Sequence, residues 1–248
     1  MLEESVLRRG ILVAVEGIDG AGKTTQVDLM CGALMRAGEF VVRSKEPTNG
    51  QWGSVLRRSA STGRLPLDEE LQTFIKDRTE HVDKLINPNR DAGAIVILDR
   101  YFYSTIAYQG ARGADAPAVQ AEMLRLFPRP DAVFLLDVDP IVGINRIAND
   151  RCEKPNHFEE RGSLAAARSI FSQMQDDNIH KIDGHLPIDV VHERIMSLFI
   201  AGPLKEKRCA KEYGCGDPFH CSFRHSGMCE WWSLKSNLGA HEAASLIK

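Results

Sequence analysis

The segment "GIDGAGKT", Gly17 to Thr24, has the residue types and the spacing of a loop that binds phosphate. Glycines let backbone N–H groups converge on phosphate oxygens, and the start of the following helix adds a positive partial charge. Lys23 supplies a full positive charge, and the Thr24 hydroxyl is suited to bind Mg²⁺. We therefore expect a nucleoside triphosphate, ATP or GTP, at this loop, whose residues are Gly17, Ile18, Asp19, Gly20, Ala21, Gly22, Lys23, Thr24 and Thr25.

A second polar segment, "DRYFYSTIAYQG" from Asp99 to Gly110, follows the apolar run Ala94 to Leu98. If that run is a strand of an open parallel sheet, its carboxyl end lies at the edge where such sheets bind ligands, beside the phosphate loop. Asp99 can then hold a water molecule bound to Mg²⁺, and Arg100 can neutralise the phosphate of a second substrate. The segment predicts the acceptor side of a phosphate-transfer site.

The elements that position these residues follow from the hydrophobic pattern. Short apolar runs alternate with longer segments of helical period, which is typical of a parallel sheet with helices on both faces. The predicted strands are Ile11 to Val15, Phe40 to Arg43, Ala94 to Leu98, Ala132 to Leu136 and His180 to Asp183. The predicted helices are Lys23 to Ala37, Leu67 to Pro88, Pro117 to Phe127, Pro140 to about Asn149, Ser163 to Asn178, and Ile188 to Phe199. The expected fold class is α/β, the three-layer fold of P-loop NTPases with a five-stranded parallel sheet.

The predicted helix that begins at Leu67 carries two residues suited to a binding site. Asp68 can cap its first turn, and we expect Pro88 to end it. Phe74 and Arg78 are four residues apart and therefore share one face of the helix. An aromatic ring and a guanidinium group on one face can together bind a planar ligand.

Composition limits the possible partners and the compartment. The formal net charge of −3 gives no general attraction to nucleic acid or acidic lipid, so a bound polyanion needs a local basic cluster. The longest early apolar run, "ILVAV" from Ile11, is far too short to span a membrane. With 248 residues, of which 43% are hydrophobic, the chain can form one large core. We expect a cytoplasmic protein that binds neither membrane nor nucleic acid.

The C-terminal part of the sequence has a different composition. The regular spacing of apolar residues ends at "AGPLKEKR", Ala201 to Arg208. We therefore place a main domain at residues 1–202 and an extension at 203–248. Four cysteines of the extension are separated by five, five and seven residues, and such a cluster can bind Zn²⁺. The gaps are wider than in zinc knuckles, so an iron–sulfur cluster, unliganded thiols or redox-linked pairs are alternatives. The candidate ligands are Cys209, Cys215, Cys221 and Cys229, with His225 as an alternative fourth ligand.

Four motifs in order along the chain resemble those of the thymidylate kinase family of nucleoside monophosphate kinases. They are "EGIDGAGKTTQ" at Glu16, "EPT" at Glu46, "FIKDRTEH" at Phe74 and "DRYFYSTIAYQG" at Asp99. The resemblance runs from about Gly10 to Phe199, and the last motif is the most specific. It implies transfer of the γ-phosphoryl group of ATP to dTMP, with Mg²⁺, in a homodimer.

The resemblance also assigns residues of the acceptor site. It implies that Phe74 stacks on thymine and that Arg78 hydrogen-bonds the base, whereas Asp19 lies near the 3′-hydroxyl. The full set that it implies for dTMP is Asp19, Glu46, Pro47, Arg57, Phe74, Arg78, Arg100, Ser104, Tyr108 and Gln109. One departure is Lys45, where many relatives have arginine, which can form a bidentate fork that lysine lacks.

A polar loop between two predicted helices is expected to act as a lid, at about residues 146–161. The family has two arrangements, one with arginine directly after the acid of the phosphate loop and one with glycine there and basic residues in the lid. Gly20 identifies the second arrangement, in which Arg146 or Arg151 stabilises the transferring phosphoryl group, and we favour Arg151. The catalytic set is then Lys23, Asp99, Arg100, Arg151 and Asp19, and both lid arginines contact ATP.

Two alternative functions are also compatible with these motifs. One is a kinase of the same fold with another deoxypyrimidine monophosphate as acceptor, because a single methyl group changes affinity by only about 1–3 kcal/mol. The other is a non-catalytic protein that binds nucleotide or RNA. Intact Lys23, Thr24, Asp99 and Arg100 argue against this second alternative.

Overall fold

A computed structural model of the chain describes residues 10–151 and 161–205. Its centre is a five-stranded sheet in the order β2-β3-β1-β4-β5, in which all neighbouring strands are parallel. The prediction of a five-stranded parallel α/β fold is therefore confirmed. The strands are β1 (Ile11–Glu16), β2 (Val41–Lys45), β3 (Ile95–Asp99), β4 (Ala132–Asp137) and β5 (Ile179–Asp183).

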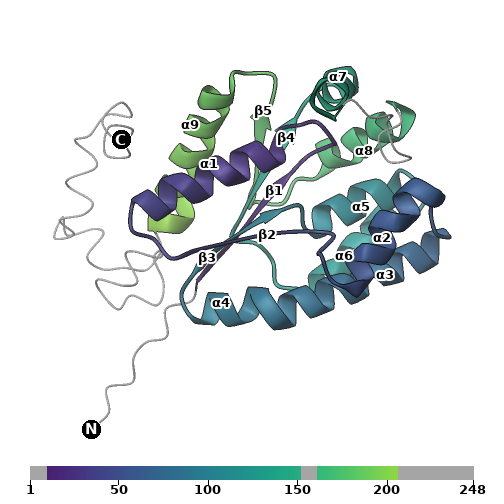
Figure 1. Ribbon diagram of the computed structural model, residues 1–248, viewed down its shortest axis with the longest axis horizontal. Coiled ribbons are helices and arrows are strands. Elements are labelled where there is room, and N and C mark those ends of the chain that lie inside the picture. The colour runs from purple at the N-terminus through teal and green to yellow at the C-terminus, as the bar shows by residue number, and fades with distance from the viewer. Residues whose placement is uncertain (1–9, 152–160, 206–248) are drawn as a thin grey trace, which may run out of the picture.

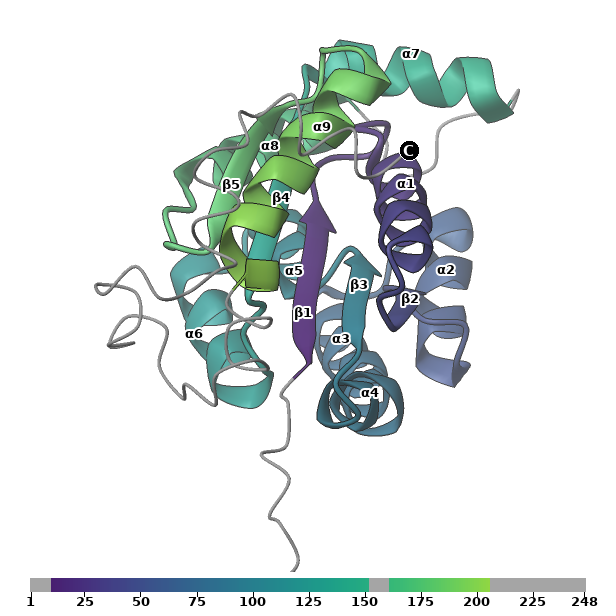
Figure 2. The same ribbon diagram turned by 90° about the vertical axis from the view of Figure 1, so that its left-hand side faces the viewer.

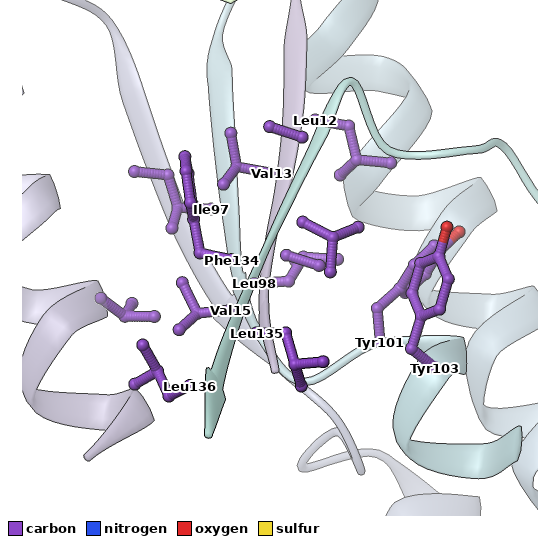
Figure 3. Packing of buried hydrophobic residues seen from close by; sticks show 14 of the residues in the cluster. Leu12, Val13, Val15, Ile97, Leu98, Tyr101, Tyr103, Phe134, Leu135 and Leu136 are labelled. Atoms are coloured by element: carbon purple, nitrogen blue, oxygen red, sulfur yellow. The ribbon is translucent and has the colours of Figure 1, made fainter. Parts of the chain in front are cut away.

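The core lies on both sides of the central strands. β1 and β3 are buried along their whole length, which explains why their sequences are continuous apolar runs and not alternating patterns. Figure 3 shows side chains of β1, β3 and β4 packed around Val13, Ile97 and Phe134. This packing fixes the strand ends from which the phosphate loop and the Asp99 segment emerge.

Helices cover the two faces of the sheet (Figures 1 and 2). On one face lie α1 (Lys23–Arg36) and α9 (Ile188–Phe199); on the other lie α3 (Leu67–His81), α5 (Phe102–Gly110) and α8 (Arg161–Gln173). The outer helices α2 (Gln51–Thr62), α6 (Ala116–Leu126) and α7 (Pro140–Arg151) pack on α3, α5 and α8 respectively.

Two of these helices, α2 and α5, were not predicted. Every residue of α5 from Phe102 to Gln109 is buried, so no polar face marks its helical period. The sequence of α2 is rich in serine and threonine and contains Gly53, and these residues have low helix propensity. Tertiary packing, not local sequence preference, therefore decides both helices.

The expectation that Pro88 ends the long helix is wrong. The chain remains helical through a π-helical segment (Val82–Ile86) and then α4 (Asn87–Asp91), with Pro88 in the first turn of α4. In a regular helix the Pro88 ring would clash with the carbonyl group four residues earlier. The π turn immediately before it widens the backbone, since Asn87 N–H donates to the Val82 carbonyl oxygen, five residues back.

Two other expectations concern the end of helix α8 and the boundary of the main domain. Helix α8 ends at Gln173, earlier than the predicted Asn178, because a turn in which Ile179 N–H donates to the Asp176 carbonyl oxygen leads into β5. Leu204, in a second π-helical segment (Ile200–Leu204), is buried in the core. Packed structure thus reaches Leu204, and the domain boundary at residue 202 stays a prediction.

Within the ranges 10–151 and 161–205, no helix has the length and apolar character needed to cross a bilayer.

Truncation of a side chain of β3 should test the packing of the core. We expect Ile97→Ala to lower the free energy of unfolding by roughly 2–5 kcal/mol, because Ile97 is fully buried and a cavity would remain. The control is Leu124→Ala on α6, a position that is 38% exposed, where the change should be within about 0.5 kcal/mol. Urea unfolding measures both values, and equal losses would contradict the assignment of the core.

Candidate active site

The phosphate loop connects β1 to α1, as predicted. Gly17, Gly20 and Gly22 have φ angles of 140°, 75° and 93°, a range that favours glycine. Lys23 folds back over the loop, and its Nζ donates to the Ile18 carbonyl oxygen at 2.7 Å. Burial and the nearby Arg100 charge lower the pKa of Lys23 to about 8, so the ammonium group stays mostly protonated at neutral pH. The loop therefore presents a positive charge to a bound phosphate.

Thr24 and Asp99, the two predicted Mg²⁺ residues, meet at the carboxyl ends of β1 and β3. The Thr24 hydroxyl donates to Asp99 Oδ2 at 2.5 Å. Hydroxyl and carboxylate oxygens suit Mg²⁺, which takes most of its other ligands from water and substrate phosphates. The residues present therefore fit the expected metal ion.

Arg100 lies between the phosphate loop and α5. Its backbone has a φ of 71°, which is unusual for a residue other than glycine. Nη2 is 2.5 Å from Asp19 Oδ1, and Nη1 donates to the Gly17 carbonyl oxygen at 3.2 Å and to Ser104 Oγ at 2.9 Å. Burial would raise the pKa of Asp19, but the charges of Arg100 and Lys23 hold it below its ordinary value. Arg100 and Asp19 thus form a charged pair within the predicted site.

A pocket of about 170 Å³ opens beside this pair. Helices α2, α3 and α5 contribute its walls, and Phe74 and Arg78 both face it from α3, as the helical spacing predicts. Tyr108 closes the side nearest the phosphate loop, where its hydroxyl donates to Asp19 Oδ2 at 2.9 Å. The lining residues are Asp19, Glu46, Pro47, Leu56, Arg57, Ala60, Phe74, Arg78, Arg100, Tyr101, Ser104, Thr105 and Tyr108.

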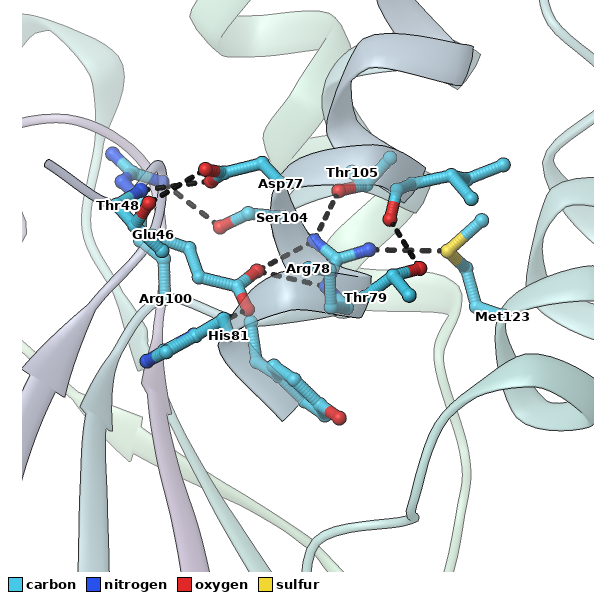
Figure 4. Close-up of polar contacts among 12 residues, drawn as sticks. Glu46, Thr48, Asp77, Arg78, Thr79, His81, Arg100, Ser104, Thr105 and Met123 are labelled. Atoms are coloured by element: carbon cyan, nitrogen blue, oxygen red, sulfur yellow. Dashed lines mark hydrogen bonds and ion pairs between the residues drawn. The ribbon is translucent and has the colours of Figure 1, made fainter. Parts of the chain in front are cut away.

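Arg78 is held by a buried polar network (Figure 4). Its Nε donates to Glu46 Oε2 at 2.8 Å and its Nη2 to the Thr105 hydroxyl at 2.8 Å, although the side chain is only 1% exposed. His81 lies 3.0 Å from the other oxygen of Glu46. Burial alone would raise the pKa of Glu46, but Arg78 and His81 lower it. Glu46 therefore orients Arg78 and does not itself need to contact a ligand.

The remaining acceptor residues differ in their placement. Gln109 is not among the residues that line this pocket, and its amide donates to Glu70 Oε2 at 2.8 Å; its place in the acceptor site stays a prediction. Arg57 lines the pocket and also donates to the carbonyl oxygens of Pro47 and Thr48. Lys45 is exposed at the end of β2.

Of the two predicted lid arginines, Arg146 is the one whose side chain the structure describes. Its Nη2 donates to the Gly184 carbonyl oxygen at 3.0 Å, and its Nη1 lies 3.4 Å from the Gly20 carbonyl oxygen. It is therefore next to the phosphate loop. The Arg151 side chain, most of the predicted lid and all candidate zinc ligands (Cys209, Cys215, Cys221, Cys229 and His225) lie outside the described residues.

Sequence reasoning missed several residues of the site. Leu56 and Ala60 line the pocket from α2, the helix that was not predicted. Thr105 and Glu16 lie inside motifs that were recognised, but neither was given a role. Tyr101 also lies in a recognised motif and was given no role; its side chain is fully buried, yet it lines the pocket. The motifs themselves were the signal that could have identified Thr105 and Glu16.

Comparison with known proteins decides the family of this site. The family model described as "Thymidylate kinase" matches residues 15–195. The chain belongs to the thymidylate kinase family. It is 47% identical over 192 residues to the thymidylate kinase of Xanthomonas oryzae pv. oryzae, covering 77% of this chain and 84% of that protein. It is 44% identical over 197 residues to the thymidylate kinase of Xylella fastidiosa, covering 79% and 90% respectively.

One close backbone contact joins the phosphate loop to helix α7. A Cβ atom at position 20 would lie 2.2 Å from the Gly143 carbonyl oxygen, and a Cβ atom at position 143 would lie 2.5 Å from the Asp19 carbonyl oxygen. Helix α7 therefore packs its backbone directly on the loop, and glycine is needed on both sides.

Gly143→Ala should disturb the phosphate loop. We expect it to lower the free energy of unfolding by roughly 1–3 kcal/mol and to weaken ATP binding, because the new methyl group would displace Asp19. Calorimetric titration with ATP and urea unfolding measure these changes. The control is Gly162→Ala in α8, where a Cβ atom meets nothing within 4 Å. Unchanged ATP affinity in Gly143→Ala would contradict the importance of this contact.

Proposed function

We propose that this chain transfers the γ-phosphoryl group of ATP to the phosphate of dTMP, giving ADP and dTDP. The main observation behind this proposal is that Asp19 and Arg100 lie at the phosphate loop and also line the adjacent pocket. ATP bound at the loop and an acceptor bound in the pocket would therefore meet at these two residues. Membership of the thymidylate kinase family supports dTMP as the acceptor over the other deoxypyrimidine monophosphates.

In this proposal the donor side is formed by the phosphate loop. Backbone N–H groups of the loop and the Lys23 ammonium group bind the β- and γ-phosphates. Thr24 and Asp99 would hold Mg²⁺, which neutralises charge on the phosphates when bound. Arg146 is our candidate for contact with ATP, which is supported by its hydrogen bonds to the carbonyl oxygens of Gly20 and Gly184. Arg151 remains our candidate for the lid arginine at the transferring group.

The acceptor side uses Arg100 for the phosphate and α3 for the base. An oxygen of the dTMP phosphate attacks the γ-phosphorus atom while the bond between that atom and the β,γ-bridging oxygen breaks, and ADP leaves. Arg100 would give up part of its ion pair with Asp19 and bind the acceptor phosphate instead. Stacking on Phe74 gives affinity without choosing a base, so selectivity must come from polar groups such as Arg78 and from the shape of the pocket.

A non-catalytic nucleotide-binding or RNA-binding role is not favoured. The described residues bring Lys23, Thr24, Asp99 and Arg100 together with the geometry outlined above, which supports catalysis.

Three finer expectations are proposals too. We infer a homodimer and a cytoplasmic location from the family, and a zinc site from the cysteine spacing of the extension. Analytical ultracentrifugation of the full chain tests the dimer, and elemental analysis of the purified protein tests for zinc.

The proposed reaction makes a direct prediction about acceptors. In a coupled assay for ADP release with ATP and Mg²⁺, we expect kcat/KM to be highest for dTMP among dTMP, dUMP, dCMP, dGMP, dAMP and UMP. The difference between dTMP and dUMP should reflect one methyl group, about 10- to 200-fold. A different leading acceptor would overturn the choice of dTMP, and no turnover despite ATP binding would overturn the kinase proposal.

Phe74→Ala should weaken acceptor binding selectively. We expect kcat/KM for dTMP to fall roughly 5- to 150-fold, because a stacked base is worth about 1–3 kcal/mol, whereas KM for ATP should change little. Phe40→Ala is the matched control, since Phe40 is 54% exposed and is not among the residues that line the pocket. An equal effect of both substitutions would exclude stacking on Phe74.

A further inference from the structure

Glu16, the last residue of β1, is a fully buried acid that accepts hydrogen bonds from the loop after β3. Its Oε1 accepts from the Tyr101 N–H at 2.7 Å and from the Ser104 N–H at 3.2 Å. Its Oε2 accepts from the Ser104 hydroxyl at 2.5 Å. None of the roles described above uses this carboxyl group, although its partners are next to the acceptor pocket.

The hydrogen bonds from the Tyr101 and Ser104 N–H groups cap helix α5, although Glu16 itself lies in β1. Helix α5 begins after Tyr101, whose side chain forms no capping hydrogen bond. The first N–H groups of a helix lack the regular partner four residues earlier, and a negative charge near them is favourable. The Ser104 N–H is shared between Glu16 and the Tyr101 carbonyl oxygen, each at 3.2 Å. Glu16 supplies both an acceptor and a charge, and it thereby fixes the start of α5 relative to the end of β1.

The third contact links Glu16 to Arg100 through a single hydroxyl group. Ser104 Oγ donates to Glu16 and accepts from Arg100 Nη1 at 2.9 Å. A serine hydroxyl has one hydrogen and two lone pairs, so an ionised Glu16 keeps the hydrogen directed away from Arg100. If Glu16 were protonated, its proton would lie on Oε2, because Oε1 already accepts two N–H groups. The hydrogen of the Ser104 hydroxyl group would then have to point in another direction. The Arg100 N–H group already lies in one of the directions that are available.

We propose that Glu16 is a positioning residue of the acceptor site: its ionised carboxylate, acting through Ser104 and the first turn of α5, holds the Arg100 guanidinium group where it can bind the acceptor phosphate. The inference rests on the proposed kinase function. Glu16 does not touch substrate in this proposal. It selects the orientation of the group that does.

The surroundings make this carboxylate sensitive to pH. The charged groups that face it are Arg100 from the loop after β3 and Lys23 from α1. Burial raises the pKa of Glu16 to about 7, and the hydrogen bond from Ser104 and the charge of Arg100 offset only part of that effect. The proposed positioning form is therefore gained as pH rises through neutrality.

Glu16→Gln tests the inference with little change of shape. The glutamine oxygen can still accept from the Tyr101 and Ser104 N–H groups, but its NH₂ group donates toward Ser104 Oγ. We expect KM for dTMP to rise about tenfold while KM for ATP changes less than about twofold. In the unsubstituted protein, the acid limb of kcat/KM for dTMP should lie near pH 7, where Glu16 ionises. In the variant it should move to about pH 6, where the phosphate ester of dTMP undergoes its second ionisation.

Ser104→Ala tests whether the effect passes through the hydroxyl group. We expect this variant also to show an acid limb near pH 6, and we expect Glu16→Gln to have little additional effect on KM for dTMP in its background. If Glu16→Gln folds poorly, the acid limb of Ser104→Ala alone tests the relay. Independent, additive effects would overturn the relay and leave Glu16 as a helix cap only.

Glu70→Gln is the matched control. Glu70 is another fully buried glutamate and holds Gln109, Arg64 and Arg112, but it does not contact Arg100 in the described structure. Its substitution should leave the acid limb near pH 7. A shift of the limb equal to that in Glu16→Gln would overturn the assignment of the limb to Glu16.

Urea unfolding gives a readout that does not depend on activity. Because the pKa of Glu16 is raised from 4.5 to about 7 on folding, its contribution to stability is fully present below pH 4.5 and is lost as pH rises toward 7. The unfolding free energy of the unsubstituted protein relative to Glu16→Gln should fall across this interval.

The outcomes separate the two proposals. If stability falls with pH in this way but dTMP is not phosphorylated, the kinase proposal fails alone. If dTMP is phosphorylated but KM and the acid limb do not change, the role of Glu16 is overturned.

Discussion

The pairing of β1 with β3 is the constraint on which the rest of the site depends. The two strands run parallel with Val15 opposite Asp99, so the residues that follow each strand emerge side by side. Gly17 therefore meets Arg100, and Glu16, the last residue of β1, meets the loop that follows β3. The Thr24–Asp99 contact and the Arg100–Asp19 pair both require this register. A shift by one residue would send the side chains of β3 to the opposite faces of the sheet.

Charge balance is the second organising feature of the site. Asp19 and Arg100 neutralise one another, and Glu46 neutralises Arg78 behind the pocket. The Glu46–Arg78 pair is fully buried and the Asp19–Arg100 pair is partly buried, so each pairing avoids the cost of leaving a charge without a partner away from water. Arg100 can exchange part of its pairing because it is at the pocket surface, whereas Arg78 is tied to Glu46 and Thr105 on its inner side. The two arginines thus differ in freedom, although both face the acceptor pocket.

Much of the architecture could be predicted from the sequence, because the signals were local. The strand runs are continuous and apolar, and the phosphate-loop motif fixes its own conformation through glycines. The four-residue spacing of Phe74 and Arg78 determined their common face. Other features depend on tertiary structure that no local pattern contains. Helix α5 is buried on all sides, Pro88 is accommodated by a π turn, and the Gln109 amide donates to Glu70. The contribution of α2 to the pocket could not be predicted once the helix itself was missed.

The contact between Gly20 and Gly143 limits which residues the phosphate loop can accept at position 20. Here that position has a left-handed backbone, and any side chain would begin 2.2 Å from a backbone oxygen of α7. A side chain at position 20 can therefore enter only if α7 moves away from the phosphate loop. The identity of one residue in the loop is thus limited by the position of a helix that comes much later in the chain.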